Sequence, residues 1–276
     1  MNVLELTALL AIGSFAAGLL GALTGLGGGI VIVPLLTLGF GVDLRYAIGA
    51  SLISVIATSS GAAAAYVREG YTNVRIGMLL EIGTTIGAVI GAYIAGLIPT
   101  NIIAVIFAMV LLFTAYRQIR PHHHANINTP SDPLAIKLRL GSTYPTSEGK
   151  QEYTVHAVKT GFSLMTIAGI LSGLLGIGSG VIKVLAMDQT MRLPFKVSTT
   201  TSNFMIGVTA AASAGVYFSR GDIDPFVAAP VAVGVLLGAT AGSRLLGRLQ
   251  NNVIRIVFVI VLLWVSTEML LKGIRR

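Results

Sequence analysis

The stretch Gly21-Ala-Leu-Thr-Gly-Leu-Gly-Gly-Gly29 interrupts a long apolar run near the N-terminus, and Gly176-Ile-Gly-Ser-Gly180 interrupts another in the second half of the chain. Each run is longer than the roughly 20 residues that one membrane span needs and shorter than two such spans. We therefore expect each glycine cluster to split its run into a long helix and a short one, as in a re-entrant or discontinuous membrane helix.

The composition is that of an integral membrane protein. Of the 276 residues, 54% are hydrophobic and 11% are charged, whereas soluble domains average about 25% charged residues. Continuous apolar runs favour an all-α bundle over a β-barrel. The net charge of +8 needs no nucleic-acid partner, because basic residues commonly flank the spans of inner-membrane proteins. The absence of cysteine excludes disulfides, thiol catalysis and iron–sulfur ligation.

The apolar stretches predict a multi-pass protein of the inner (plasma) membrane. Most stretches are long enough to cross the membrane, but 29–40 and 180–191 are too short. Glu5 precedes the first stretch without a basic residue, so this stretch is expected to be a spanning helix and not a cleaved signal. The stretches cover 4–24, 29–40, 46–67, 75–98, 101–117, 157–175, 180–191, 197–218, 226–247 and 251–272.

The two halves are copies of one unit, related by an offset of 151 residues. Ser51 and Thr58 fall on Ser202 and Thr209. The glycines that coincide at this offset are Gly18, Gly25, Gly27, Gly29, Gly83, Gly87 and Gly91 with Gly169, Gly176, Gly178, Gly180, Gly234, Gly238 and Gly242. The last three of each set recur every four residues, which predicts helix faces in close contact. We expect residues 1–117 to form repeat one and 157–276 repeat two.

The number of helical elements in each repeat determines the topology. If each glycine cluster forms a hairpin, each half has five elements and the repeats are inverted, whereas four elements would make them parallel. The distribution of arginine and lysine favours neither scheme. We expect inverted repeats on the precedent of secondary transporters, in which inverted repeats and broken helices are common.

The polar segment 118–156 is expected to lie outside the membrane. Ile136, Leu138 and Leu140 alternate with charged residues, and a second run covers 152–158, which together predict a short β-hairpin. The three histidines at 122–124 are expected to lie in a solvated loop. Because no nearby residues complete a coordination shell, we predict no metal site and no cofactor.

The glycine clusters predict a site for an anion. A helix that begins inside the membrane presents unpaired N–H groups and a partial positive charge to an anionic ligand. Close helix packing is the alternative role for these glycines. The backbone groups expected at the site are those of Gly27, Gly28, Gly29, Gly178, Ser179 and Gly180.

Intramembrane polar side chains extend this predicted site. Lys183 replaces the Ile32 of repeat one, and a lysine inside an apolar run is usually functional. The hydroxyl and amide donors predicted at the site are Ser51, Thr201, Ser202 and Asn203. The alternative is that lysine reaches a lipid headgroup and the hydroxyls bond to their own helices. Glu81 and Asp188 are further acidic residues that could carry a coupling proton or simply reach the membrane interface.

The sequence resembles the sulfite exporter TauE/SafE family of membrane proteins. The resemblance is carried by the motif at 21–29, by Pro34, by Ala-Ile-Gly-Ala-Ser at 47–51 and by the second glycine cluster at 173–180. It implies export or exchange of small anions such as sulfite, sulfonates or sulfoacetate across the inner membrane. Repeat two departs from this pattern at Ser179, Lys183 and Leu185, so the predicted site is not strictly symmetric.

We therefore expect a secondary transporter of small sulfur-containing or organic anions that works by alternating access. The partners expected are the anion and the lipid bilayer. The sequence does not decide whether the protein forms a homo-oligomer. Alternatives are an anion channel, a structural subunit and a membrane-embedded enzyme. An enzyme is disfavoured, because the chain has neither a cysteine nucleophile nor an intramembrane pair of acidic residues. The sequence does not specify the anion, the coupling ion or the direction of transport.

Overall fold

The computed structural model describes residues 3–24, 28–68, 70–119, 131–146, 149–246 and 251–275. The first half contains α1 (Val3–Thr24), α2 (Gly29–Pro34) with a π-helical turn (Leu35–Gly39), α3 (Leu44–Arg68), α4 (Val74–Leu97) and α5 (Thr100–Ile119). A small segment follows, with α6 (Pro133–Lys137), β1 (Ser142–Thr146) and β2 (Gly149–Tyr153). The second half contains α7 (Val158–Leu175), α8 (Gly180–Leu185) with a π-helical turn (Ala186–Thr190), α9 (Phe195–Ser219), α10 (Pro225–Leu246) and α11 (Asn251–Ile274).

The element boundaries in the two halves follow the offset found in the sequence. Both ends of α2, of its π-helical turn and of α3 recur 151 residues later, in α8, in its π-helical turn and in α9. Each π-helical turn continues its short helix and ends before the long helix that follows. The short helices therefore begin at equivalent glycines, Gly29 and Gly180.

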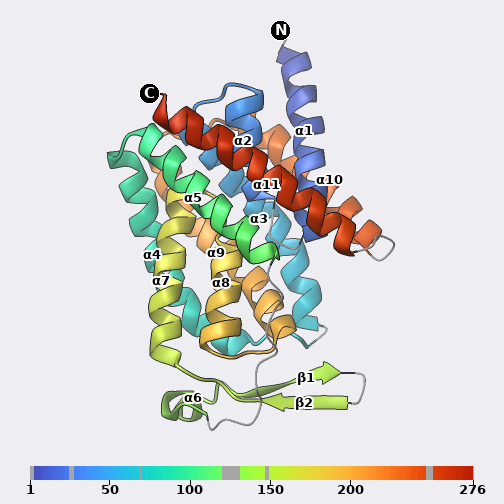
Figure 1. The fold of residues 1–276 in the computed structure, drawn as a ribbon, viewed down its shortest axis with the longest axis vertical. Coiled ribbons are helices and arrows are strands. Elements are labelled where there is room, and N and C mark those ends of the chain that lie inside the picture. The colour runs from blue at the N-terminus through green and yellow to red at the C-terminus, as the bar shows by residue number, and fades with distance from the viewer. Residues whose placement is uncertain are drawn as a thin grey trace.

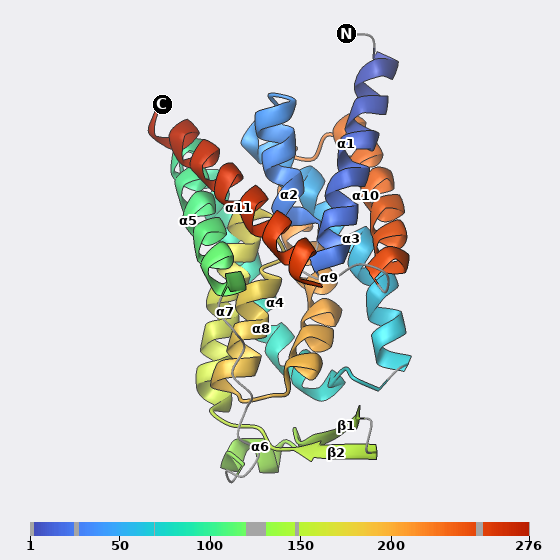
Figure 2. The same cartoon turned by 45° about the vertical axis from the view of Figure 1, so that its right-hand side comes forward.

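The chain reverses direction at each glycine cluster. In Figures 1 and 2, α1 runs from the end of the molecule that carries both termini toward the middle, and α2 returns toward that same end. Helix α7 starts at the opposite end, beside the hairpin, and also runs to the middle, from which α8 returns. Helices α3 and α9 pack against each other, as do α5 and α11.

Close helix packing uses the glycines spaced by four residues. Helix α4 packs along α7, and α10 packs along α1. A Cβ atom at Gly87 or Gly91 would collide with the backbone of α7, and one at Gly234 or Gly238 would collide with the backbone of α1. The predicted close approach of these faces is confirmed, because only glycine leaves room for the facing carbonyl groups.

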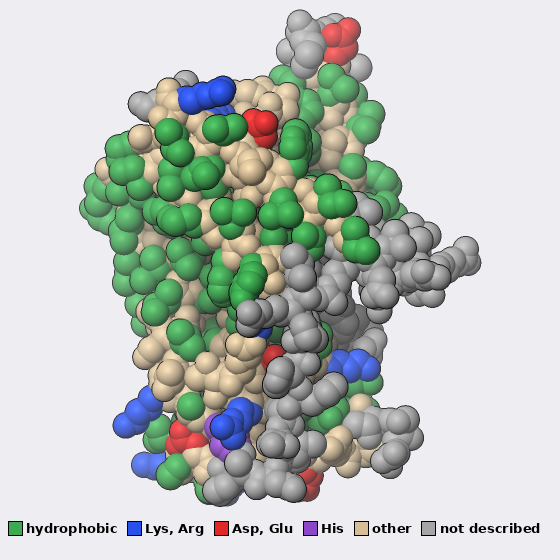
Figure 3. Space-filling model, viewed as in Figure 1, with side chains coloured by type: hydrophobic (Ala, Val, Ile, Leu, Met, Phe, Trp, Pro, Cys, Tyr) green, Lys and Arg blue, Asp and Glu red, His purple; other side chains and the backbone are tan. Residues whose placement is uncertain are grey.

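The surface has the apolar character of a membrane protein. Within the described residues, four helical stretches are long and apolar enough to cross a membrane: Val74–Leu97, Thr100–Arg117, Val158–Leu175 and Pro225–Gly242. In Figure 3, hydrophobic side chains cover the middle and upper part of the visible face, and charged side chains gather mainly at the end that carries α6 and the hairpin. Large hydrophobic side chains such as Tyr93 and Trp264 are exposed on the surface of the helices, as is typical of membrane-spanning segments.

The segment between the halves differs in detail from the hairpin predicted there. Strands β1 and β2 pair antiparallel from Ser142 opposite Tyr153 to Thr146 opposite Gly149. The strand predicted over 136–140 is wrong, because α6 covers Pro133–Lys137. Asp132 caps this helix by accepting a hydrogen bond from the amide of Leu134, and proline is favoured in the first turn. The histidines at 122–124 lie outside the described residues.

The hairpin segment is fixed to the helical bundle by two polar residues. Asn73 caps α4, and its amide nitrogen donates to the carbonyl of Leu140 and the hydroxyl of Tyr153. Asp132 also accepts a hydrogen bond from the amide of Val158 at the start of α7. These backbone hydrogen bonds hold the pKa of Asp132 below its usual range.

Candidate functional site

The backbone at the second glycine cluster has the conformation that glycine favours. Gly176 and Gly178 have φ angles of +67° and +70°, and Ser179, which precedes α8, has a φ of +45°. A positive φ is uncommon for a residue with a Cβ atom and often marks a functional position. The Ser179 hydroxyl is buried and has no hydrogen-bond partner within the described residues. At the first cluster Gly28 precedes α2, whereas Gly27 lies outside the described residues.

The two glycine clusters meet inside the molecule. Ser51 on α3 donates a hydrogen bond of 2.8 Å to the carbonyl of Gly176, and its hydroxyl lies 3.4 Å from the carbonyl of Gly29. Its equivalent on α9, Ser202, donates to the carbonyl of Gly180 at 3.3 Å. A Cβ atom at Gly29 would lie 3.1 Å from the Gly176 carbonyl oxygen. One serine hydroxyl therefore joins clusters that are far apart in the sequence.

Aliphatic side chains fill the junction of the two clusters in this conformation. Val55 on α3 lies against Gly29 and Gly178, and Ile206 on α9 also lies against Gly178. Ile48 on α3 covers Gly176. Aliphatic side chains from α3 and α9 therefore occupy the space beside the glycines of the junction.

Lys183 is fully buried beside the junction. It lies in the last turn of the short helix α8, and its amide donates to the carbonyl of Ser179. The ammonium group donates a hydrogen bond of 2.6 Å to the hydroxyl of Thr209 on α9. That hydroxyl lies 2.7 Å from Oε1 of Glu81 on α4, to which it can donate. The chain therefore buries a lysine and a glutamate that are joined through one threonine hydroxyl.

The Lys183–Thr209–Glu81 network joins the two halves: Glu81 belongs to the first half, and Lys183 and Thr209 belong to the second. The residues equivalent to Lys183 and Glu81 are Ile32 and Ala232, both apolar. An ionic group removed from water costs several kcal/mol unless it is paired and hydrogen-bonded. Burying two such groups with a shared partner, at a place where the repeated unit does without them, indicates a role other than folding.

The sequence shows Glu81 only as a separate acidic residue and gives no direct sign of its connection to Lys183. The two residues are far apart in the sequence, and Thr209 was noted only because it falls on Thr58. The available signal was the lack of symmetry, because Glu81 and Lys183 each have an apolar equivalent in the other half.

The remaining predicted polar residues do not form one cluster. Thr201 accepts a hydrogen bond from the amide of Asn73, near the hairpin segment. Asn203 is half-buried, and the hydroxyls of Thr199 and Thr200 bond back to their own helix. Asp188 is buried on the π-helical turn that follows α8. Of the predicted side chains, the structure therefore brings Ser51, Ser179, Ser202 and Lys183 to the junction.

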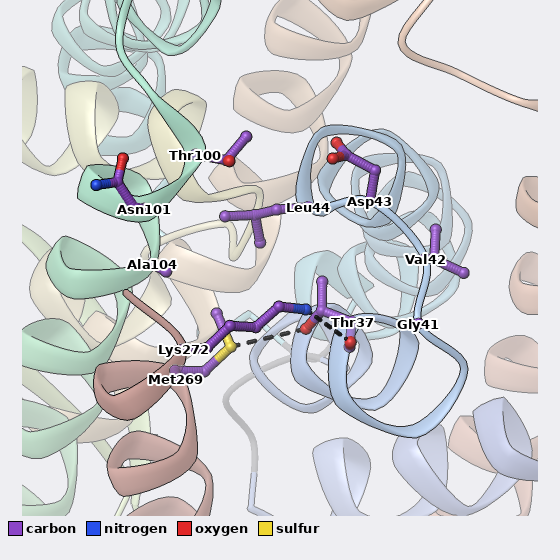
Figure 4. A pocket seen from close by; sticks show the side chains of 10 residues that line it. All are labelled: Thr37, Gly41, Val42, Asp43, Leu44, Thr100, Asn101, Ala104, Met269 and Lys272. Atoms are coloured by element: carbon purple, nitrogen blue, oxygen red, sulfur yellow. Dashed lines mark hydrogen bonds between the residues drawn. The ribbon is translucent and has the colours of Figure 1, made fainter. Parts of the chain in front are cut away.

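A separate pocket lies among the π-helical turn after α2, α5 and α11 (Figure 4). Its volume is about 160 Å³. Lys272 reaches across it and donates a hydrogen bond of 2.9 Å to the carbonyl of Thr37, while Asp43 and Asn101 also line it. No cluster of three or more histidine or acidic residues suited to a metal ion occurs in the described part of the chain.

Comparison with known proteins identifies relatives along nearly the whole chain. The family model described as "Sulfite exporter TauE/SafE" matches residues 10–269. The chain is 27% identical to "Probable membrane transporter protein YunE" of Bacillus subtilis, over 94% of this chain and 95% of the relative. It is 25% identical to YdhB of the same species, described in the same words, over 87% and 91%. A "Probable membrane transporter protein" of Xylella fastidiosa is 25% identical over 91% and 90%. No solved structure matches the chain significantly.

Proposed function

Because the chain belongs to the sulfite exporter TauE/SafE family, we propose that it is a secondary transporter of small sulfur-containing or organic anions, such as sulfite and sulfonates. The family and the relatives support a multi-pass membrane transporter. The anion class, the inner membrane as its location and the mechanism of alternating access are parts of the proposal.

The buried ammonium group of Lys183 is the observation that carries this proposal. It is a positive charge with no exposed surface, placed beside the junction of the two glycine clusters. A buried cation attracts an anion strongly, because little water screens the interaction. Ser179 adds a buried hydroxyl without a partner in the described residues, which could donate a hydrogen bond to a sulfonate or sulfite oxygen.

The course of the chain supports inverted repeats with re-entrant helices. Helices α1 and α7 enter from opposite ends of the molecule, and each is followed by a short helix that returns to the end from which it came (Figures 1 and 2). In secondary transporters, discontinuous helices of two inverted repeats commonly form the substrate site near the centre of the bilayer.

The way in which the junction is closed supports alternating access as part of the proposal. Val55 on α3 and Ile206 on α9 belong to equivalent helices of the two halves. A rocking motion of one half against the other would separate these side chains toward one side of the membrane at a time. The hydroxyls of Ser51 and Ser202, which now donate to carbonyl groups, would then be able to turn toward the anion.

Counterflow in proteoliposomes tests this proposal. Vesicles loaded with unlabelled sulfite are expected to take up labelled sulfite transiently, at a rate that saturates with concentration. Lys183→Met is expected to abolish this uptake, whereas Lys196→Met, which removes an exposed lysine of α9, is expected to retain it. Sulfonates and short carboxylates assayed in the same way define the anion class.

Other functions predict different outcomes in the same assay. Flux that does not saturate, without counterflow, would indicate an anion channel. The absence of flux for every anion of the panel, in protein that elutes as a folded species, would contradict the proposal.

A further inference from the structure

The side chains of Glu81, Thr209 and Lys183 come from three helices, α4, α9 and α8, and meet in the interior. Thr209 Oγ1 lies 2.6 Å from Lys183 Nζ and 2.7 Å from Glu81 Oε1. Lys183 and Thr209 have no exposed surface, and Glu81 is 8% exposed. Because an ammonium group can only donate, the Thr209 oxygen accepts from Lys183, and its single proton can be donated to Glu81.

The two oxygens of the Glu81 carboxyl group have different surroundings. Oε1 accepts from the hydroxyls of Thr209 and Thr85. Oε2 is buried and has no hydrogen-bond partner within the described residues. A carboxylate oxygen without a donor in a dry interior is costly. Oε2 is therefore the atom at which a proton would be added.

Lys183 is the charged group that interacts electrostatically with Glu81, and Glu81 is the charged group that interacts electrostatically with Lys183. Helix α7 presents Phe162 and Thr166 to α4 at Gly83, two positions beyond Glu81. Asp188 is buried on the π-helical turn that continues α8 and packs against α7. Lys159 of α7 and Lys196 of α9 are exposed, Arg220 binds Asp222, and the hydroxyl of Tyr217 donates to Gly173.

The charge balance of this network links anion binding to a proton. Lys183 and Glu81 together are neutral when both are ionised. A monovalent anion that binds Lys183 would leave one uncompensated negative charge in the interior, which is strongly unfavourable. A proton on Glu81 removes that charge, so binding of the anion and binding of the proton favour each other.

Thr209 provides the physical connection between the two events. Its hydroxyl lies 3.0 Å from the carbonyl of Met205, which is a second acceptor for its single proton. When Glu81 is neutral, the hydroxyl can turn from Oε1 to this carbonyl group. Lys183 then loses its connection to a carboxylate and becomes available to an external anion.

We propose that Glu81 is a proton site, and that its protonation releases Lys183 to bind the transported anion, so that one proton moves with each monovalent anion. The proton comes from solution and forms a bond to Oε2, and no other covalent bond changes. This inference rests on the proposed anion transport, and it adds the identity of the coupling ion and of the residue that carries it.

Transport of methanesulfonate by proteoliposomes tests this inference, because this anion keeps a single charge across the accessible pH range. An inward proton gradient is expected to concentrate it inside the vesicles about tenfold per pH unit, which is the ratio for one proton per anion. The transport is expected to be electroneutral, so that an imposed membrane potential has no effect on the ratio.

Glu81→Gln is the decisive variant, because glutamine has the shape of the neutral carboxyl group. It is expected to lose accumulation driven by the proton gradient, and the counterflow that remains is expected not to vary with pH. The matched control is Glu268→Gln, which removes an exposed carboxyl group of α11 and is expected to accumulate the anion like the original protein.

The outcomes separate this inference from the proposed function. Accumulation by Glu81→Gln equal to that of the original protein would overturn the proton site and leave anion transport intact. A lack of methanesulfonate counterflow in the original protein at every pH would contradict transport of this anion and with it the inference. If Glu81→Gln fails to fold, Thr209→Val takes its place. Valine has no hydroxyl to connect Glu81 with Lys183, so this variant is expected to show a weaker pH dependence of transport. Thr209→Ser keeps the hydroxyl and is expected to keep the pH dependence.

Discussion

Lys183 and Glu81 are interdependent, because each is the partner that makes burial of the other tolerable. Breaking a buried ion pair by removing one member typically costs about 3–5 kcal/mol, whereas replacing both members by uncharged residues is often neutral. Lys183→Met leaves a carboxyl group in a dry site, and Glu81→Gln leaves an ammonium group there. The double variant removes both charges.

The double variant is accordingly expected to be more stable than Lys183→Met alone. Thermal unfolding of the purified proteins in detergent at neutral pH measures this difference. The single variant is expected to unfold several degrees below the original protein, and the double variant is expected to recover most of the loss. If the double variant loses as much stability as the two single variants together, the two residues do not interact.

Among the helices, the packing of α4 on α7 makes a sharper prediction than any single hydrogen bond. Gly91 faces the backbone of Ile170, and a Cβ atom there would collide with main-chain atoms that cannot rotate away. Gly91→Ala is therefore expected to push the helices apart and to cost roughly 1–3 kcal/mol.

Gly215 on α9 provides the matched control for this substitution. A Cβ atom at Gly215 has no other atom within 4 Å, and the residue lies inside a helix. Gly215→Ala is expected to leave stability unchanged or to raise it by up to about 1 kcal/mol, through helix propensity alone. Equal effects of the two substitutions, measured by thermal unfolding in the same detergent, would contradict the assigned packing.

The sequence predicted the long apolar helices well, because they depend on local composition. Glycines spaced by four residues predict a packed face, and the offset of 151 residues places equivalent helix boundaries. The prediction of a strand at 136–140 was wrong. Over so few residues, alternating apolar and charged residues fit a strand and also a short helix such as the one that Asp132 caps. Long-range features were not accessible in this way. The bond from Ser51 to Gly176, the aliphatic filling by Val55 and the pairing of Lys183 with Glu81 all depend on how helices from the two halves cross.

For the molecule as a whole, the proposed transport requires the junction of the two glycine clusters to open alternately to the two sides of the membrane. It also requires the open junction to bind an anion. Ser51 is the residue that joins the clusters in the closed conformation. The chain contains no cysteine, so a single cysteine at position 51 can be labelled without background.

Labelling of Ser51→Cys by a membrane-impermeant thiol reagent is the most direct measurement. In proteoliposomes of known orientation that retain counterflow, the account predicts that position 51 reacts with reagent supplied from either side. Saturating methanesulfonate is predicted to slow the reaction from both sides, and Lys183→Met is predicted to remove this protection. A cysteine that reacts from one side only, or at a rate that the anion does not change, would contradict the account.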